Sequence, residues 1–132
     1  MIVFDASALV SAALEVDSVP ERALLRAEEV DVFALSPAVD REIEEVLNRP
    51  KFAQAIRGER REYVLGILRD QAVWFDPVVP VADCRDRKDD KYLELALVAA
   101  AQTTVSGDDD ILVLHPWRGV HILCPAEYLA LS

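Results

Sequence analysis

The chain has 132 residues, which fits one domain, because two separate hydrophobic cores would each be unusually small. Hydrophobic residues make up 52% of the chain, which excludes a disordered protein, and no apolar run reaches the length of a membrane span. The formal net charge is −10, which taken alone argues against nucleic-acid binding, because phosphates would be repelled.

The first residues lack the basic flank of a secretory signal, and Asp5 interrupts their apolar run. We therefore expect a cytoplasmic protein with no membrane association. Cys84 and Cys124 have no CxxC spacing and no paired histidines near them. Two reduced cysteines are expected, rather than zinc ligands or a disulfide.

The first half of the chain alternates short β-favouring runs with segments in which apolar residues recur at helical spacing. Ser36 and Pro37 are the residue types favoured at a helix N-cap and at the first helical position. The predicted order is a strand (2–4), a helix (6–14), a helix opened by Pro20, a strand (31–35) and a helix from Ser36 to about Leu47.

The second half continues the alternation. We expect a helix or hairpin with an apolar stripe of Tyr63, Val64, Ile67 and Leu68, which is either core or a surface for a partner protein or a second subunit. There follow a strand (73–75), a polar loop (83–89), a helix (about 90–101), a strand (103–106), a turn (107–110), a strand (120–123) and a helix opened by Pro125. This order predicts an α/β fold, a single domain over residues 1–132 with a mainly parallel central sheet flanked by helices.

Four acidic residues stand in separate segments close to the ends of predicted strands or the starts of helices. Asp5 follows the first strand, Glu42 lies in the helix after the second, Asp90 starts the helix after the polar loop, and Asp108 follows the strand at 103–106. Because the carboxyl ends of parallel strands share one edge, these side chains are expected to converge. Carboxylates held together share protons or bind a cation, and Mg²⁺ or Mn²⁺ among oxygen ligands suits phosphodiester hydrolysis. The pattern predicts a divalent-metal site.

Each of these acids also has an ordinary structural role. Asp5 suits an N-cap, which by itself is as good an explanation. Glu42 borders the apolar stripe of its helix whereas Glu45 points away from it, so Glu42 is preferred. Asp89 and Asp90 both stand at a helix start, and Asp90 is preferred because it shares a face with apolar residues of that helix.

Two smaller groups complete the candidate site. Ser7 is either a plain first-turn helix residue or a group that orients Asp5 or a metal-bound water. Residues 49–61 carry five basic side chains against the single acid Glu59, a local balance of +4 in an acidic chain. We expect that basic segment to contact phosphates; its members are Arg49, Lys51, Arg57, Arg60 and Arg61.

These motifs resemble the PIN-domain nucleases, of the VapC-like kind found as toxins in toxin–antitoxin pairs. The matching stretches keep their order over nearly the whole chain and include Leu-Ser-Pro and Arg-Pro-Lys-Phe signatures. They are residues 2–11, 35–37, 42–52, 84–86, 89–96, 105–112 and 122–129.

The resemblance implies that the four acids of the family correspond to Asp5, Glu42, Asp90 and Asp108, with Asp89 as the less favoured neighbour of Asp90 and Asp110 as an auxiliary to Asp108. The first motif reads Asp-Ala-Ser here, where the family often has Asp-Thr-Asn, and a small polar side chain is kept at the third place. The resemblance further implies an RNA substrate, dependence on Mg²⁺ or Mn²⁺, homodimerisation and inhibition by an antitoxin protein.

Two alternatives stay open at this point. One is a PIN-fold interaction module without catalytic activity, which the presence of all four acids disfavours. The other is an aspartate-based phosphatase with Asp5 as nucleophile. Enzymes of that class place a second Asp two residues later, where this chain has Ser7.

Overall fold

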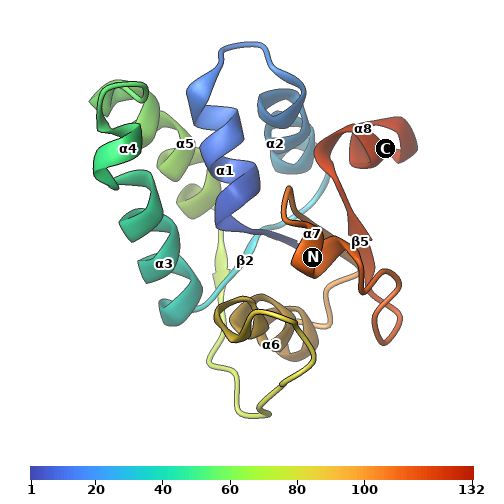
Figure 1. Cartoon of the computed structure of the whole chain (residues 1–132). Helices are drawn as coiled ribbons and strands as arrows, with labels where there is room; N and C mark the ends of the chain where they lie inside the picture. Colours follow the sequence, from blue (N-terminus) through green and yellow to red (C-terminus); the bar gives the residue numbers. More distant parts are fainter.

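The computed structural model describes residues 1–132, the whole chain, and its centre is a set of five short parallel strands (Figure 1). They are β1 (Ile2–Phe4), β2 (Ala34–Leu35), β3 (Val73–Trp74), β4 (Thr103–Val105) and β5 (His121–Leu123). β1 pairs with β4, β4 with β5, and β2 with β3, all in parallel. A parallel bridge between Ile2 and Phe33 places β2 beside β1, which gives the order β3-β2-β1-β4-β5. The predicted α/β fold with a parallel sheet is confirmed.

Helices cover both faces of this sheet. They are α1 (Ala6–Leu14), α2 (Val19–Val30), α3 (Pro37–Leu47), α4 (Pro50–Ala53), α5 (Gly58–Asp70), the 3₁₀ turn η1 (Arg87–Asp89), α6 (Asp90–Val98), α7 (Asp109–Leu112) and α8 (Pro125–Leu131). α1 packs against α2, α3 and α5, and α8 packs against α2. α6 packs against β1, β2 and β4 on the other side of the sheet (Figure 1).

The strand order creates a switch point between β1 and β4. From β1 the chain moves outward to β2 and β3 and then returns to β4 on the other side of β1. Right-handed crossovers therefore place α1–α5 on one face and α6 on the opposite face. In open parallel sheets of this kind the crevice at the carboxyl ends of the two central strands is the usual ligand site.

Local sequence signals account for the helix starts. Ser36 Oγ accepts a hydrogen bond from the Val39 amide at 3.2 Å, and Pro37 is the first residue of α3, as predicted. Asp5 caps α1, and Asp108 caps α7. These caps matter for function because two of them are also candidate site residues.

The apolar stripe of residues 63–68 belongs to a helix, α5, and not to a hairpin. Val64, Ile67 and Leu68 are buried in the main core, and only Tyr63, 46% exposed, reaches the surface. The core interpretation is therefore confirmed, and the stripe is not a free surface for a second protein.

Both cysteines are free thiols, with Cys84 buried and Cys124 partly buried. Burial raises the pKa of Cys84 to about 12, and the neighbouring Asp90 carboxylate adds to this shift. None of the helices has the length and apolarity needed to cross a bilayer.

Candidate active site

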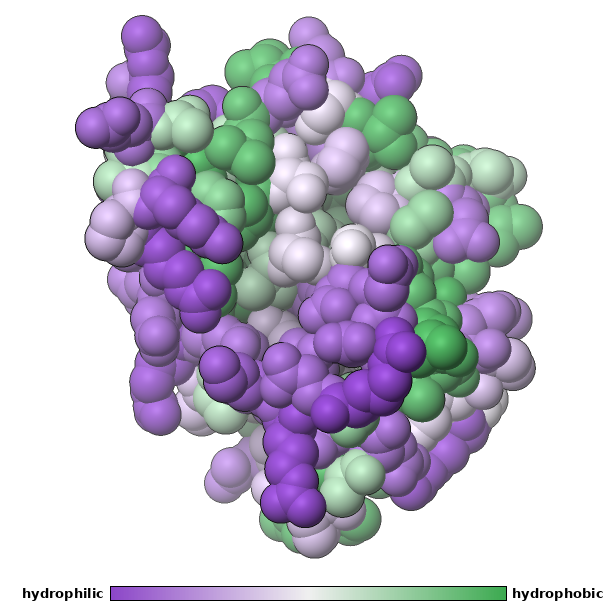
Figure 2. All heavy atoms as spheres, in the orientation of Figure 1, coloured by the Kyte–Doolittle hydropathy of each residue, from purple (hydrophilic) through white to green (hydrophobic).

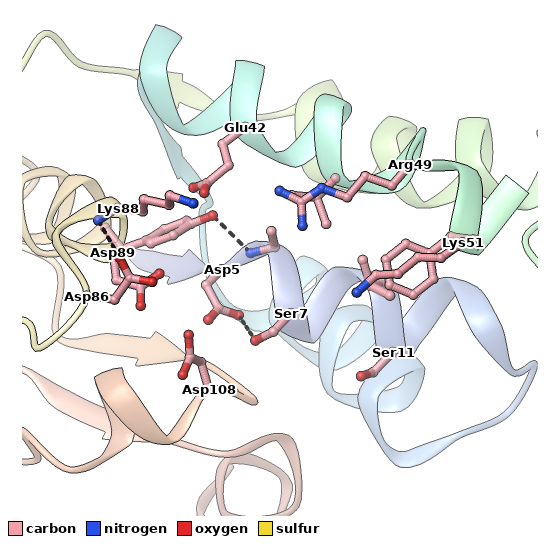
Figure 3. Close-up of a pocket in the computed structure, with 15 residues that line it drawn as sticks. Asp5, Ser7, Ser11, Glu42, Arg49, Lys51, Asp86, Lys88, Asp89 and Asp108 are labelled. Carbon is pink, nitrogen blue, oxygen red and sulfur yellow. Dashed lines mark hydrogen bonds between the residues drawn. The ribbon is translucent and has the colours of Figure 1, made fainter.

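A cavity of about 430 Å³ opens at the carboxyl edge of the sheet, between the segments that follow β1 and β4 (Figure 3). Acidic side chains from four separate segments line it: Asp5, Glu42, Asp86, Asp89 and Asp108. On the surface, hydrophilic atoms gather over the region of α6 and along α3, around a paler hollow over α1 (Figure 2). Three of the four predicted acids, Asp5, Glu42 and Asp108, thus line one cavity.

Asp5 follows β1 directly and is almost fully buried, with 1% of its surface exposed. Its Oδ1 accepts hydrogen bonds from the Ala8 amide at 2.9 Å and from Ser7 Oγ at 2.7 Å. Its Oδ2 accepts one from Ser106 Oγ. Burial raises the pKa of Asp5 to about 6, against the opposing effect of these hydrogen bonds, and the charge of Asp108 adds to the rise. Asp5 therefore serves as the N-cap of α1 and lines the cavity at the same time.

Two serines join the end of β1 to the end of β4. Ser106 Oγ donates to Asp5 and accepts from the Asp108 amide at 2.9 Å. Ser7 Oγ donates to Asp5 and accepts from the Gly107 amide at 2.9 Å. Ser7 thus orients Asp5, which is one of the two roles that the sequence left open.

Asp89 lines the cavity together with Asp108. Only 8% of Asp89 is exposed, and its Oδ2 is buried without a hydrogen-bond partner. Burial, followed by the negative charge of Asp108, raises the pKa of Asp89 to about 7. Asp108 uses its Oδ1 to accept from the Asp110 amide at 2.9 Å. The two carboxylates form a site in which like charges oppose each other.

Asp90, the residue preferred from the sequence, does not line the cavity, whereas its neighbour Asp89 does. Asp90 is as buried as its neighbour, but its Oδ1 accepts a hydrogen bond from the Cys84 amide at 2.9 Å. The side chain thereby fixes the polar loop before α6. Asp90 points inward as predicted, but its carboxylate contacts the backbone of the polar loop and not the cavity.

Asp110 also lies outside the cavity and forms an ion pair with Arg85 at 3.0 Å. Asp86, Asp89 and Asp110 have carboxylate oxygens within 4.8 Å of one another, so Asp89 is shared between this group and the cavity. Asp110 therefore has an auxiliary position, beside Asp89 rather than beside Asp5.

Glu42 reaches the cavity from α3 and is half-buried, whereas Glu45 is exposed, as helix geometry predicts. Lys91 Nζ lies 3.3 Å from Glu42 Oε2, but this buried oxygen has no hydrogen-bond partner. Tyr92 Oη stands next to Glu42 and accepts from the Ala6 amide at 3.2 Å. Burial, and then Glu42, raise the pKa of Tyr92, so the phenol keeps its proton.

Only two of the five basic residues predicted for phosphate contact, Arg49 and Lys51, line the cavity (Figure 3). Arg60 lies away from the cavity, because its Nη2 pairs with the buried carboxylate of Glu21 and donates to the Ala12 carbonyl at 2.8 Å. Arg60 therefore holds α5 against α1 and α2.

Arg57 and Arg61 stand at the start of α5 and do not line this cavity. Lys88, which the sequence reasoning did not select, takes part in the basic lining instead. No local signal marked Lys88, because its place in the lining depends on how α3 and α6 meet.

Comparison with protein-family models matches residues 1–110 to the PIN domain. The chain belongs to the PIN domain family. No curated protein and no solved structure matches it significantly. The match includes every acid of the cavity, and PIN domains are generally nucleases that typically use divalent metals. A nuclease-type function is therefore indicated for the acidic cavity of this PIN domain.

The donor set of this PIN domain fits a hard divalent cation. A carboxylate oxygen accepts two hydrogen bonds, so Asp5 Oδ2, which accepts one, keeps a lone pair. Asp89 Oδ2 accepts none although it is buried. Burying ionised carboxylates beside one another is unfavourable unless a cation or a proton is shared among them. Oxygen atoms of this kind are the ligands that Mg²⁺ and Mn²⁺ prefer.

Ser106 and Tyr92 are two further residues of the site that the sequence reasoning missed. Ser106 is fully buried and bridges Asp5 to Asp108, while Tyr92 connects α6 to the first residue of α1. Ser106 ends the segment that leads to Asp108, and its position at a strand end was the available signal. Tyr92 carried no such signal, because its contact with Ala6 spans 86 residues.

Proposed function

We propose that this PIN domain is a metal-dependent ribonuclease that hydrolyses RNA phosphodiester bonds with Mg²⁺ or Mn²⁺. The observation that carries the proposal is the group of Asp5, Asp89 and Asp108 in one cavity. Their pKa shifts, to about 6 for Asp5 and about 7 for Asp89, have burial as the first cause and the charge of Asp108 as a further one. Such a site is unfavourable by itself, and a divalent cation would neutralise it.

In this proposal Asp5, Asp89 and Asp108 hold the metal, and Asp90 is replaced by its neighbour. A divalent ion bound there would lower the pKa of a bound water and neutralise charge on the phosphate and on the leaving oxygen. Ser7 and Ser106 fix the plane of the Asp5 carboxylate from both sides. Because the carboxylate is already held in place, it does not have to rearrange when the substrate binds.

Glu42 is proposed to orient the attacking water. Its Oε2 is buried in the cavity lining without a hydrogen-bond partner, so it is free to accept a hydrogen bond from water. Lys91 Nζ lies 3.3 Å from the same oxygen and compensates the charge of the carboxylate. Tyr92 fixes the backbone beside Asp5. The chain thus supplies an acceptor on one wall of the cavity and metal ligands on the other.

The basic residues on the rim are proposed to hold the nucleic-acid strand. Arg49 and Lys51 line the cavity on the side of α3 and α4, and Phe52 stands beside them. Lys51 Nζ lies 4.9 Å from the centroid of the Phe52 ring. Charged groups of this kind contact phosphates, and an aromatic face suits an unpaired base. The choice of RNA over DNA rests on the resemblance to VapC-like proteins.

A cleavage assay tests the proposal. The wild-type protein should cut RNA with Mg²⁺ or Mn²⁺ and stop when EDTA is added. Asp5→Asn should reduce the rate at least about a hundredfold, because the charge that would hold the metal is removed. Asp109→Asn is the matched control, since Asp109 is exposed beside Asp108 and does not line the cavity. Unchanged cleavage by Asp5→Asn would remove the metal site from the mechanism.

We further propose that the protein is the toxin of a toxin–antitoxin pair, on the strength of the same resemblance. Production of the wild-type chain in a bacterial host should arrest growth, and production of Asp5→Asn should not. Co-production of the protein encoded by the neighbouring gene should restore growth and should co-purify with the chain. Growth arrest by the Asp5→Asn chain would contradict a toxic role for the nuclease.

A further inference from the structure

A second cavity of about 340 Å³ adjoins the acidic one. Four basic side chains from α3, η1 and α6 and their junctions line it: Arg41, Arg49, Lys88 and Lys91. Glu42, Arg49 and Lys88 line both cavities, so the two are continuous. In Figure 3, Arg49 and Lys88 lie on either side of Glu42, at the boundary between them. Arg41 belongs to the second cavity alone.

The charge of the second cavity is positive in a chain whose net charge is −10. Its acids are Glu42, which pairs with Lys91, and the exposed Glu45. Arg41, Arg49 and Lys88 form no ion pair within the chain. The second cavity therefore has three unpaired cations and one unpaired acid.

The concentration of unpaired cations here is not a general feature of the surface. Of the fourteen Lys and Arg residues, six form ion pairs with acids of the chain. Of the remaining eight, four line these two adjoining cavities: Arg41, Arg49, Lys51 and Lys88. In a chain with 24 acidic residues, cations gathered without partners at one place indicate an anionic ligand from outside.

We propose that the second cavity binds the phosphate next to the one that is cleaved. This inference rests on the proposed nuclease function and extends it from one phosphate to two. A nucleic-acid strand that places one phosphate at Asp5 and Asp89 carries its neighbouring phosphate a single nucleotide away, and the continuous cavity leads along α3 to Arg41. The guanidinium group of Arg41 offers the paired donors that match phosphate oxygens. Arg41 is in this account a substrate-binding residue that was not selected from the sequence.

The test compares short substrates with one phosphate and with two. The two nucleotides that flank the cleaved bond in a longer RNA are synthesised as a dinucleoside monophosphate. This substrate is prepared without a further phosphate, with an added 5′ phosphate, or with an added 3′ phosphate. For wild type, one of the two added phosphates should raise kcat/KM. In Arg41→Ala that gain should fall about tenfold, the value of a hydrogen-bonded ion pair with the ligand. Arg41→Lys should retain part of the gain, because it keeps the charge without the fork.

Arg22→Ala is the matched control, since Arg22 is an exposed and unpaired arginine on α2 that lines neither cavity. It should keep the full wild-type gain. A gain in Arg41→Ala equal to that of wild type would overturn this inference while leaving the nuclease proposal intact. If wild type cleaves none of the substrates, nor the longer RNA, the proposed function fails and the inference fails with it.

Discussion

Asp89 and Asp90 are adjacent in the sequence and equally buried, but their carboxylates have different environments. Asp90 accepts a hydrogen bond from the Cys84 amide, whereas Asp89 has an oxygen without a partner in the acidic cavity. Helix periodicity correctly predicts an inward direction for Asp90. It does not predict that Asp89 also points inward, because Asp89 ends a 3₁₀ turn, whose residues follow a different angular spacing. Whether each carboxylate lies against the loop backbone or in the cavity depends on contacts with residues distant in the sequence.

Replacing Asp89 and Asp90 separately by the isosteric asparagine distinguishes a metal ligand from a residue that only fixes the loop. Asp89→Asn should lower the affinity for Mn²⁺ and reduce RNA cleavage at least about a hundredfold, because a ligand charge is lost. Asp90→Asn should leave both within about threefold, because the amide oxygen still accepts from the Cys84 amide. Isothermal titration with Mn²⁺ and initial cleavage rates measure these effects. The reverse ranking of the two variants would restore Asp90 as the ligand.

The stability of the metal-free protein should depend on pH through Asp89. Its pKa is raised from an ordinary 3.8 to about 7, so the folded state binds the proton more tightly than the unfolded state does. Stability should therefore fall as the pH rises from about 4 to about 7. In EDTA at pH 8, Asp89→Asn should be more stable than wild type by about 1–2 kcal/mol, and this advantage should shrink at pH 5. Thermal unfolding at both pH values measures it, and an advantage that is equal at pH 5 and pH 8 would contradict the account.

At the scale of elements, the segment from residue 49 to 61 shows what a local charge count omits. The sequence predicts one basic surface there, but a turn between α4 and α5 divides its members. Arg49 and Lys51 face the cavity, whereas Arg60 lies against Glu21 and the end of α1. Helix starts such as Ser36-Pro37 were predictable because capping is local. The direction of a long side chain was not, because a partner 39 residues away decides it.

Two arginines of this segment should therefore respond differently to truncation. Arg60→Ala leaves the buried Glu21 carboxylate without its partner and should reduce the free energy of unfolding by about 2–3 kcal/mol. Arg49→Ala should change stability by less than about 0.5 kcal/mol, since Arg49 is exposed. It should instead weaken RNA binding and reduce the salt dependence by about one phosphate contact.

Urea unfolding and fluorescence anisotropy with labelled RNA measure the two quantities, in an Asp5→Asn background so that the RNA stays intact. The account of this segment would be wrong if Arg60→Ala weakened RNA binding without loss of stability. It would equally be wrong if Arg49→Ala left the salt dependence unchanged.

At the scale of the whole molecule, topology brings the candidate site together. The alternation of strands and helices predicts a parallel sheet, and the order β3-β2-β1-β4-β5 places the switch point between Asp5 and Asp108. Both acids were predictable, because Asp5 directly follows β1 and Asp108 lies in the turn after β4. Tyr92, Lys88 and Arg41 were not, since their roles depend on how α3 and α6 meet above the sheet edge.

The net charge of −10 argued against nucleic acid, but it is an average over surfaces of opposite character. Five acids line the first cavity, where a divalent cation would compensate them, and unpaired cations line its rim and the second cavity. Global charge is therefore a poor guide for a nuclease whose own site is acidic. The distribution of charge around the sheet edge is the informative quantity.

The central claim is that the cavity at the end of β1 and β4 holds a divalent metal. Anomalous diffraction from a crystal soaked in Mn²⁺ tests it most directly. We expect a peak about 2.1–2.2 Å from carboxylate oxygens of Asp5, Asp89 and Asp108. A crystal with no peak in this cavity, or with its only peak between Asp86 and Asp110, would contradict it.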